Sequence, residues 1–192
     1  MAAGRSARMG EQKLLMPFNG MPMLDFVIKT VLSCGFDGTY AVVSRETLDR
    51  LTPAEGADYI VNPDPDRGQD SSFRHGLSLL PAGSSFAVFL ADKPMVTAAQ
   101  IINLRRRFEL LLLAGTQKSA LVPRKNGAPG HPAFYSYLWR ERFLRSDAGC
   151  RSALFRRERE KDVEWAEFDD CGHDSFFTDV DTPEDYRRLT GL

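Results

Sequence analysis

Apolar residues in the first part of the chain alternate between short continuous runs and longer stretches with helical spacing. A short apolar run bounded by glycine, proline or asparagine is typical of a buried strand. Runs of this kind at residues 39–44, 58–62 and 85–91 predict three strands. In residues 23–34 apolar side chains recur at i, i+3, i+4, i+7 and i+8, which predicts an amphipathic helix ahead of the first of these strands.

Two further helices are predicted at residues 71–80 and 97–113, and Thr97 stands where its hydroxyl group can cap the second of them. Strands that alternate with helices in this order predict a three-layer α/β domain, Rossmann-like, around a mostly parallel central sheet. Right-handed crossovers then place the functional site at the carboxyl ends of the strands.

The pattern changes after Lys118, where shorter strands and polar helices are predicted. The strands are expected at residues 119–123, 132–136, 163–168 and 176–180, and the helices at residues 137–144, 150–160 and 183–189. A length of 192 residues fits a single domain with a substantial core. We divide this domain, residues 1–192, into a first half at 1–118 and a second half at 119–192.

The overall charge and composition narrow the class of protein. Hydrophobic residues make up 43% of the chain, and the formal net charge is −1, so no nucleic-acid or membrane partner is expected. The amino terminus has no apolar stretch of the kind found in signal peptides. The three cysteines are widely spaced and form no metal-binding pattern, which indicates reduced thiols in a cytoplasmic protein without a zinc site.

Residues 2–13 (AAGRSARMGEQK) combine two glycines with three cationic side chains. Glycine permits positive φ and close backbone approach, so successive N–H groups can form a nest that binds an anion. Arginine and lysine in the same loop can neutralise a triphosphate. Taken alone, the segment is more simply explained as a solvated basic amino terminus.

This segment resembles the LAAGxSxRMGxxK signature of the MobA-like NTP transferase family. The resemblance implies a nucleotidyltransferase fold in which the loop binds a nucleoside triphosphate, with Arg8 and Lys13 as catalytic cations. The remaining nucleotide-binding residues that it implies in this loop are Ala2, Ala3, Gly4, Arg5, Ser6 and Gly10. The triplet AAG at residues 2–4 resembles the cytidylyltransferase branch of the family, whereas the guanylyltransferase branch carries AGG. Through this resemblance Ala3 implies that the nucleotide is CTP.

The apolar run at 85–91 ends in Asp92, followed by Lys93 and Pro94. A carboxylate at the end of such a strand is placed to bind Mg²⁺, although an aspartate there can also simply order the turn. The sequence ADKP resembles the ADxP motif of the family, which implies that Asp92 is catalytic and binds the metal. Most members carry glutamine or methionine where this chain has Lys93, which adds a cation beside the metal.

Two loops carry further similarity to the family. Asn62-Pro63, with Gly68 and Ser72, resembles the NPxxxxGxxxS segment, which implies that Asn62, Gly68 and Ser72 contribute to nucleotide binding. Without the resemblance these residues read as a turn leading into a helix. The GHP triplet at Gly130, His131 and Pro132 is similar to the wall of the pterin-side pocket and implies acceptor binding.

The last two motifs lie near the carboxyl terminus. Residues 146–151 (SDAGCR) resemble the family's GDxGaR turn, with serine in place of the first glycine, and imply that Asp147 and Arg151 bind the acceptor. Residues 179–185 (DVDTPED) resemble DIDTPED. A helix that starts at Thr182-Pro183 explains these two residues. It does not explain the two aspartates at the end of the predicted strand, so Asp181 and Asp179 are candidate second ligands of Mg²⁺.

The resemblance extends from Ala2 to Tyr186 and implies transfer of CMP from CTP to molybdopterin or the molybdenum cofactor, with release of pyrophosphate. Two alternatives remain: a transferase that uses GTP or another phosphorylated acceptor, and a non-catalytic module that holds the cofactor or docks on a client molybdoenzyme. Family members begin with a strand that runs into the phosphate loop. We expect that first strand to be missing here, because Met1 stands at its last position.

Overall fold

The computed structural model describes residues 12–145, 160–168 and 174–191. Its helices are α1 (Met23–Leu32), α2 (Arg45–Leu48), α3 (Gln69–Leu79), α4 (Ala98–Leu113), α5 (Tyr137–Arg145) and α7 (Pro183–Thr190). Its strands are β1 (Pro17–Phe18), β2 (Met21–Pro22), β3 (Tyr40–Val43), β4 (Asp58–Val61), β5 (Phe86–Val88), β6 (Ala120–Lys125), β7 (Ala128–Pro129), β8 (Ala133–Tyr135) and β9 (Val163–Glu167). Single turns of 3-10 helix occur at η1 (Lys13–Leu15), η2 (Pro65–Arg67), η3 (Glu160–Asp162) and η4 (Asp174–Phe176).

In the part of the chain that the structure describes, the main strands form two sheets. β3 and β4 pair in parallel, with Tyr40 opposite Asp58 and Val43 opposite Val61. The second sheet has the order β5-β8-β6-β7, and β9 pairs with β6. β1 and β2 make only a two-residue hairpin ahead of α1. Among the described residues, no strand joins β3 to β5.

The prediction of a mostly parallel sheet is wrong for the second sheet. β5 with β8, β6 with β7 and β6 with β8 are all antiparallel, and only β6 with β9 is parallel. The reason is the length of the connections. A parallel pair needs a crossover of a dozen or more residues, whereas β6, β7 and β8 follow one another through short turns.

An Asn-Gly pair explains the first of these turns. Asn126 and Gly127 have φ values of 50° and 78°, and they connect Lys125 to its partner Ala128. Two successive residues with positive φ are the requirement of the type I′ turn that closes tight hairpins. The chain therefore doubles back after β6 instead of entering a helix.

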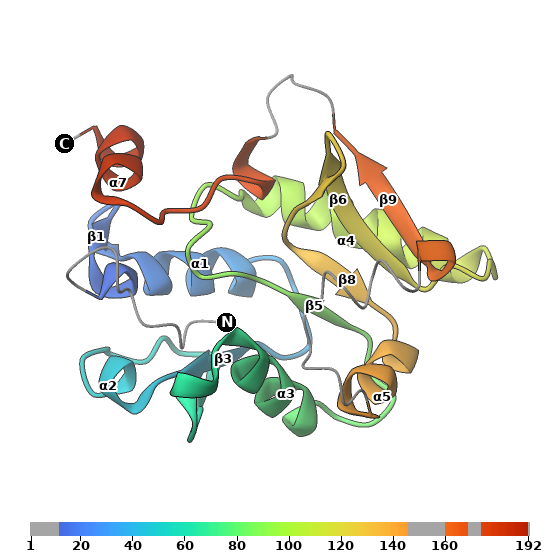
Figure 1. Ribbon diagram of the computed structural model, residues 1–192, viewed down its shortest axis with the longest axis horizontal. Helices are drawn as coiled ribbons and strands as arrows, with labels where there is room; N and C mark the ends of the chain where they lie inside the picture. Colours follow the sequence, from blue (N-terminus) through green and yellow to red (C-terminus); the bar gives the residue numbers. More distant parts are fainter. Residues whose placement is uncertain (1–11, 146–159, 169–173, 192) are drawn as a thin grey trace.

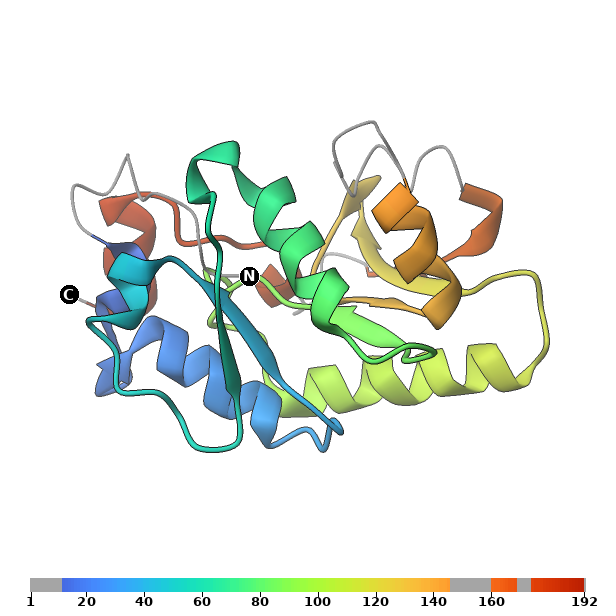
Figure 2. The ribbon, with the colours of Figure 1, turned by 90° about the horizontal axis from the view of Figure 1, so that it is seen from below.

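Helices cover both faces of the strands, as the prediction of three layers requires. Figures 1 and 2 show α1 and α4 on one side of the strands and α3 and α5 on the other. α1 is buried through Leu24, Ile28 and Val31, in keeping with its predicted apolar face. Trp139 and Phe143 of α5 join Tyr135 in a fully buried aromatic cluster.

The boundaries of most predicted elements are confirmed to within a few residues, but one predicted strand is wrong. Residues 176–180 do not form a strand, because the carbonyl group of Asp174 accepts hydrogen bonds from the N–H groups of Phe177 and Thr178 and turns the chain there. Thr97 is confirmed as the cap of α4, in a capping box with Gln100. The predicted helix at 150–160 lies, apart from its last residue, outside the described residues. None of the described helices is long and apolar enough to cross a bilayer.

Candidate active site

The pairing of β5 with β8 brings two regions of the predicted site, around Asp92 and around His131, to the same edge of the sheet. β8 runs antiparallel to β5 with Ala133 opposite Val88, so His131 lies beside the residues that follow β5, where Asp92 stands. β3 and β5 run in the same direction, as both ribbon views show. The carboxyl end of β4, with Asn62, is therefore on this edge as well, because β4 is parallel to β3.

Lys13 joins two aspartates that are far apart in the sequence. Its ammonium group donates a hydrogen bond of 2.8 Å to Asp92 Oδ2 and another of 2.8 Å to Asp181 Oδ1. The side chains of Lys13 and Asp92 are only 14% and 18% exposed, while that of Asp181 is 47% exposed. One cation thus sits between two carboxylates, partly shielded from water and open on the Asp181 side.

The charge state of Lys13 follows from these contacts. Burial by itself lowers the pKa of the lysine, because a desolvated ammonium group is disfavoured. The negative charges of Asp92 and Asp181 and the hydrogen bonds to them outweigh burial, so the pKa of Lys13 is raised above its ordinary value. Lys13 is therefore a firmly held positive charge at this edge of the sheet.

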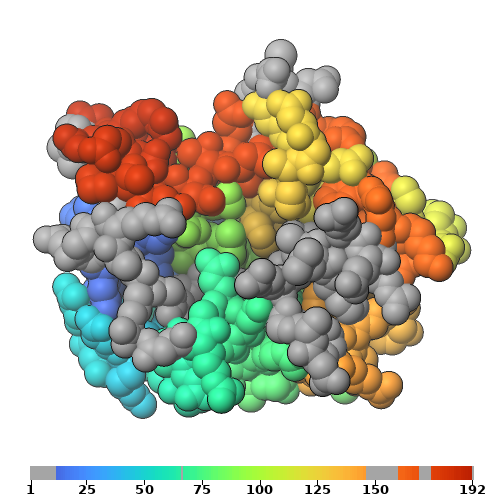
Figure 3. All heavy atoms as spheres, in the orientation of Figure 1, coloured from blue at the N-terminus to red at the C-terminus, as the bar shows by residue number. Residues whose placement is uncertain are grey.

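A second lysine–aspartate pair lies next to the first. The buried side chain of Lys93, 6% exposed, forms an ion pair with Asp179. Between the two pairs, the N–H group of Val180 donates a 2.9 Å hydrogen bond to the carbonyl oxygen of Asp92. Asp179 and Val180 thus contact the chain after β5 directly, and Asp181 is linked to Asp92 through Lys13. Figure 3 shows this C-terminal segment, in red, lying across the green chain that follows β5.

The rest of the DVDTPED segment starts α7. Thr182 Oγ1 accepts a hydrogen bond from the N–H group of Asp185, and Asp185 Oδ2 accepts one from the N–H group of Thr182. Pro183 occupies the first turn of the helix, as expected. The hydrogen bond with Thr182 holds the pKa of Asp185 below its ordinary value. The helix start therefore uses Thr182, Pro183 and Asp185, and leaves Asp179 and Asp181 to face the lysines.

The GHP triplet is held rigidly against η4. The peptide bond between His131 and Pro132 is cis, and the N–H group of His131 donates a 3.0 Å hydrogen bond to Phe176 O. Gly130 is required here, because a Cβ atom would lie 2.9 Å from that same carbonyl oxygen. His131 Nδ1 lies 3.2 Å from Val88 O and donates to it, since a carbonyl group only accepts.

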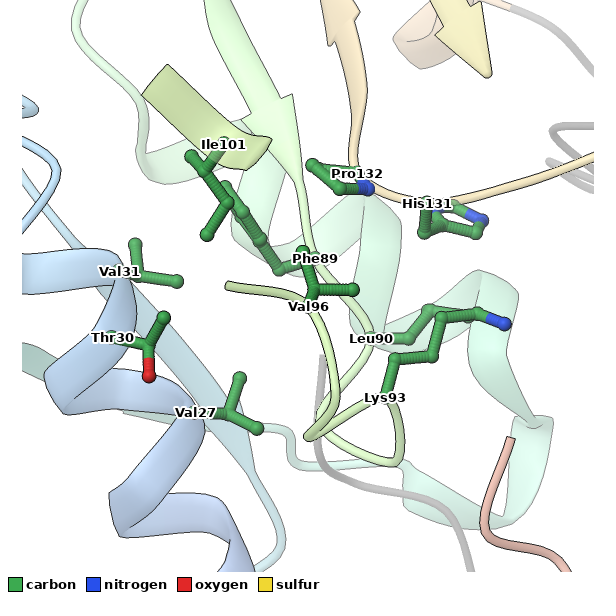
Figure 4. A pocket seen from close by; sticks show the side chains of 10 residues that line it. All are labelled: Val27, Thr30, Val31, Phe89, Leu90, Lys93, Val96, Ile101, His131 and Pro132. Carbon is green, nitrogen blue, oxygen red and sulfur yellow. The ribbon is translucent and has the colours of Figure 1, made fainter. Parts of the chain in front are cut away.

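Lys93 and His131 border a small apolar gap between α1 and the chain after β5. Figure 4 shows both side chains turned toward the same side, away from Val27, Thr30 and Val31 of α1. The gap has a volume of about 10 Å³, room for roughly one water molecule. It is therefore a packing defect beneath the site and not a substrate pocket.

Asn62 and Ser72 bond to each other instead of facing outward. Both are 3% exposed, and Asn62 Nδ2 donates a 2.9 Å hydrogen bond to Ser72 Oγ. Asn62 Oδ1 accepts further hydrogen bonds from Asp64 N and Ser71 Oγ. Gly68, with φ of 83°, makes the turn into α3 that a side chain would strain. These residues shape the loop between β4 and α3.

The carboxylates suit a divalent cation as well as an ammonium group. Mg²⁺ commonly takes one or two protein carboxylates and completes its shell with phosphate oxygens and water. Asp92 and Asp181 already converge on one cationic group, Lys13. Within the described ranges no cluster of three or more His, Cys, Asp or Glu side chains is arranged for a metal.

The structure covers part of the predicted site. The predicted residues outside its described ranges are Ala2, Ala3, Gly4, Arg5, Ser6, Arg8, Gly10, Asp147 and Arg151. Of the remainder, Lys13, Asp92 and Asp181 come together, and Gly130, His131 and Pro132 lie at the same edge. The pairing of Lys93 with Asp179 was not predicted. Two features of the sequence could have indicated this pair. Lys93 is a cation at a position that is usually uncharged in the family, and Asp179 is an aspartate that the helix start does not explain.

The chain is similar to known proteins in sequence and in fold. A model of the MobA-like NTP transferase domain matches residues 1–162. The chain is 33% identical to the "Probable molybdenum cofactor guanylyltransferase" of Thermococcus kodakarensis over 100% of its own length and 92% of that protein. It is 28% identical to the molybdenum cofactor cytidylyltransferase of Escherichia coli, covering 96% and 90% of the two chains. The crystal structure of Rv0371c from Mycobacterium tuberculosis superposes with a TM-score of 0.78 at 25% identity, over 100% of this chain and 94% of that one.

Proposed function

Because the chain belongs to the MobA-like NTP transferase family, a family of nucleotidyltransferases, we propose that it transfers CMP from CTP to molybdopterin or the molybdenum cofactor and releases pyrophosphate. The observation that carries the proposal is the convergence of Lys13, Asp92 and Asp181 at one sheet edge. A cation and two carboxylates are the groups that alignment and charge neutralisation of a triphosphate require.

The proposed reaction is attack of an acceptor phosphate on the α-phosphorus of the nucleotide. A phosphate nucleophile is already ionised near neutral pH, so the site needs no strong general base. Asp92 and Asp181 would hold Mg²⁺, which supplies charge neutralisation on the phosphates when bound. Lys13 would then turn from the carboxylates to the triphosphate, in company with Arg8.

The two halves of the domain have different proposed roles. Residues 1–118 bind the nucleotide, and the buried pair of Asn62 and Ser72 supports the loop beside it. Residues 119–192 bind the acceptor through Gly130, His131, Pro132, Asp147 and Arg151. The contact of His131 with Val88 fixes the ring beside the chain that leads to Asp92, where the acceptor phosphate must arrive.

The choice of CTP rests on Ala3, since the two curated relatives named above are a guanylyltransferase and a cytidylyltransferase. A direct test incubates the protein with Mg²⁺, a molybdopterin-type acceptor and α-labelled CTP or GTP, and separates labelled dinucleotide from free nucleotide. Labelled cytidine dinucleotide in excess over the guanosine product is expected. An excess of the guanosine product overturns the base assignment.

The same assay distinguishes the other functions. Product formed only with a sugar phosphate or another phosphorylated acceptor overturns the acceptor assignment but retains the transferase. Retention of the molybdenum cofactor on the protein, without label transfer from either nucleotide, identifies a binding module.

A further inference from the structure

The ammonium group of Lys13 and the proposed metal ion need the same two carboxylates. Lys13 Nζ lies 2.8 Å from Asp92 Oδ2 and 2.8 Å from Asp181 Oδ1. Mg²⁺ takes carboxylate oxygens as ligands, so a metal ion held by these two aspartates would draw on the same groups. Two cations placed between one pair of carboxylates repel each other. Lys13 therefore has to withdraw before both aspartates can hold a metal.

Lys13 has an anchored backbone and a long side chain that can move. The next residue, Leu14, is 6% exposed and packs in an apolar cluster with Leu24 of α1. The N–H group of Met16 donates a 3.2 Å hydrogen bond to Lys13 O. The ammonium group stands at the end of a flexible four-carbon stem, so it can change partners while this backbone stays in place. Asp181, 47% exposed, marks the side on which it can leave.

The ammonium group needs another anionic partner when it withdraws. Asp179, the third aspartate of this cluster, is already paired with the buried Lys93. A triphosphate supplies such a partner, because its oxygens accept charge-assisted hydrogen bonds from an ammonium group. Without a triphosphate, Lys13 would give up two charge-assisted hydrogen bonds at a site where its own side chain and that of Asp92 are mostly shielded from water. Metal binding is therefore costly in the nucleotide-free protein.

We propose that Lys13 holds the place of the divalent cation in the nucleotide-free protein, so that Asp92 and Asp181 bind metal tightly only after a triphosphate has drawn the ammonium group away. The inference rests on the proposed function, because it takes the two aspartates as metal ligands. It goes beyond that function in making Lys13 the group that couples metal binding to nucleotide binding. Such a coupling is reciprocal, so bound metal strengthens binding of the triphosphate by the same factor.

The test measures binding of Mn²⁺ alone, through the electron paramagnetic resonance signal of the free ion, with no nucleotide present. Lys13→Met removes the competing ammonium group and should bind Mn²⁺ about tenfold more tightly than the wild type, or better. Asp92→Asn introduced into this variant should abolish the gain. Lys125→Met is the matched control, because it breaks a lysine–aspartate pair outside the site, and its Mn²⁺ affinity should equal that of the wild type.

A second measurement uses the wild type and does not depend on the folding of a variant. The ¹⁵N resonance of the Lys13 ammonium group reports the surroundings of that group directly. It should stay in place when stoichiometric Mg²⁺ is added alone, because the ammonium group keeps both carboxylates. It should shift when Mg²⁺ is added together with CTP or GTP, because the group then turns to the triphosphate.

Failure of this proposal and failure of the proposed metal site give different results. Equal Mn²⁺ affinity of the wild type and Lys13→Met, with Asp92→Asn weakening both, retains the metal site and overturns competition by Lys13. A Lys13 resonance that shifts with stoichiometric Mg²⁺ alone, or that metal with either nucleotide leaves unchanged, overturns it as well. Mn²⁺ binding that Asp92→Asn leaves unaltered in both backgrounds removes Asp92 as a metal ligand, and with it both this proposal and that part of the proposed function.

Discussion

At the scale of single residues, Lys13 determines the state of the candidate site. The same ammonium group neutralises Asp92 and Asp181, which otherwise would repel each other. Since a raised lysine pKa means that folding favours the protonated form, this contribution to stability is fully present below the ordinary pKa of 10.5 and is lost as the pH rises through the pKa of the folded state.

The first prediction concerns Lys13→Met. Between neutral pH and pH 10.5 the wild-type protein should exceed this variant in free energy of unfolding by a constant margin, and the margin should shrink at higher pH. Urea unfolding across that range measures it. Lys13→Arg is the control, because an arginine keeps its charge throughout. A margin that stays constant to high pH would show that the charge of Lys13 does not bind the carboxylates.

The pair of Lys93 and Asp179 gives a second prediction at this scale. Asp179→Ala leaves the buried ammonium group of Lys93 without this partner and should lower the free energy of unfolding by about 2 kcal/mol. The loss is smaller than for a fully buried pair because the side chain of Asp179 is 41% exposed. Lys93→Met removes the buried charge itself and should lower the free energy of unfolding by less than Asp179→Ala does.

A double-mutant cycle with Lys93→Met and Asp179→Ala measures the coupling. Because the cost of losing Asp179 comes from the charge of Lys93, the double variant should be more stable than the sum of the two losses predicts, by roughly 1 kcal/mol or more. Strictly additive losses would show that the ion pair contributes nothing to the attachment of residues 179–181.

At the scale of elements, local signals in the sequence were sufficient wherever one turn or one cap decides the structure. Thr97 and Thr182-Pro183 mark helix starts through contacts within three residues, and both were predicted. The Asn126-Gly127 turn carried an equally local signal for a hairpin. The prediction of a mostly parallel sheet extended the β–α alternation of the first half to the whole sheet. It is wrong for the second sheet because this turn makes β6 and β7 antiparallel.

Gly130 supplies the prediction for this scale. Gly130→Ala places a methyl group against Phe176 O and the ring of Phe177, 2.9 Å and 2.7 Å away. The ring can turn aside, but the carbonyl oxygen is backbone and already accepts from His131. The variant should lose about 1–3 kcal/mol of stability, by urea unfolding, and raise the KM for the acceptor.

The exposed residue Ala128, on the same hairpin, provides the matched control. Ala128→Ser should change the free energy of unfolding by less than about 0.5 kcal/mol and leave the KM unchanged. If Gly130→Ala behaves like this control, the GHP triplet is not held against η4 in the way described above.

At the scale of the whole molecule, the site is made by contacts that no local pattern encodes. Lys13 lies 79 positions from Asp92 and 168 positions from Asp181. The order of motifs along the chain indicated that these residues belong to one site, but it could not show that a lysine would occupy the space between the aspartates. Nor could it show that Asp179 would turn to Lys93 rather than to the metal position.

The division into two sheets is the other property of the whole molecule. Sequence patterns identified β3 and β5 as strands, but they did not show that the two lie in different sheets of the described structure. A cavity of about 290 Å³ lies between β3 and β5, and side chains of α1 and α3 line it.

The most direct test of the account is pyrophosphate release from CTP, with Mg²⁺ and a molybdopterin-type acceptor, by the wild-type protein and by Asp92→Asn. Release by the wild type should depend on metal and acceptor, and the variant should lose activity on the order of 100-fold or more. Asp174→Asn, which changes an exposed aspartate paired with Lys125, should release pyrophosphate as the wild type does. Equal release by wild type and Asp92→Asn, or no release by the wild type from either CTP or GTP, would contradict it.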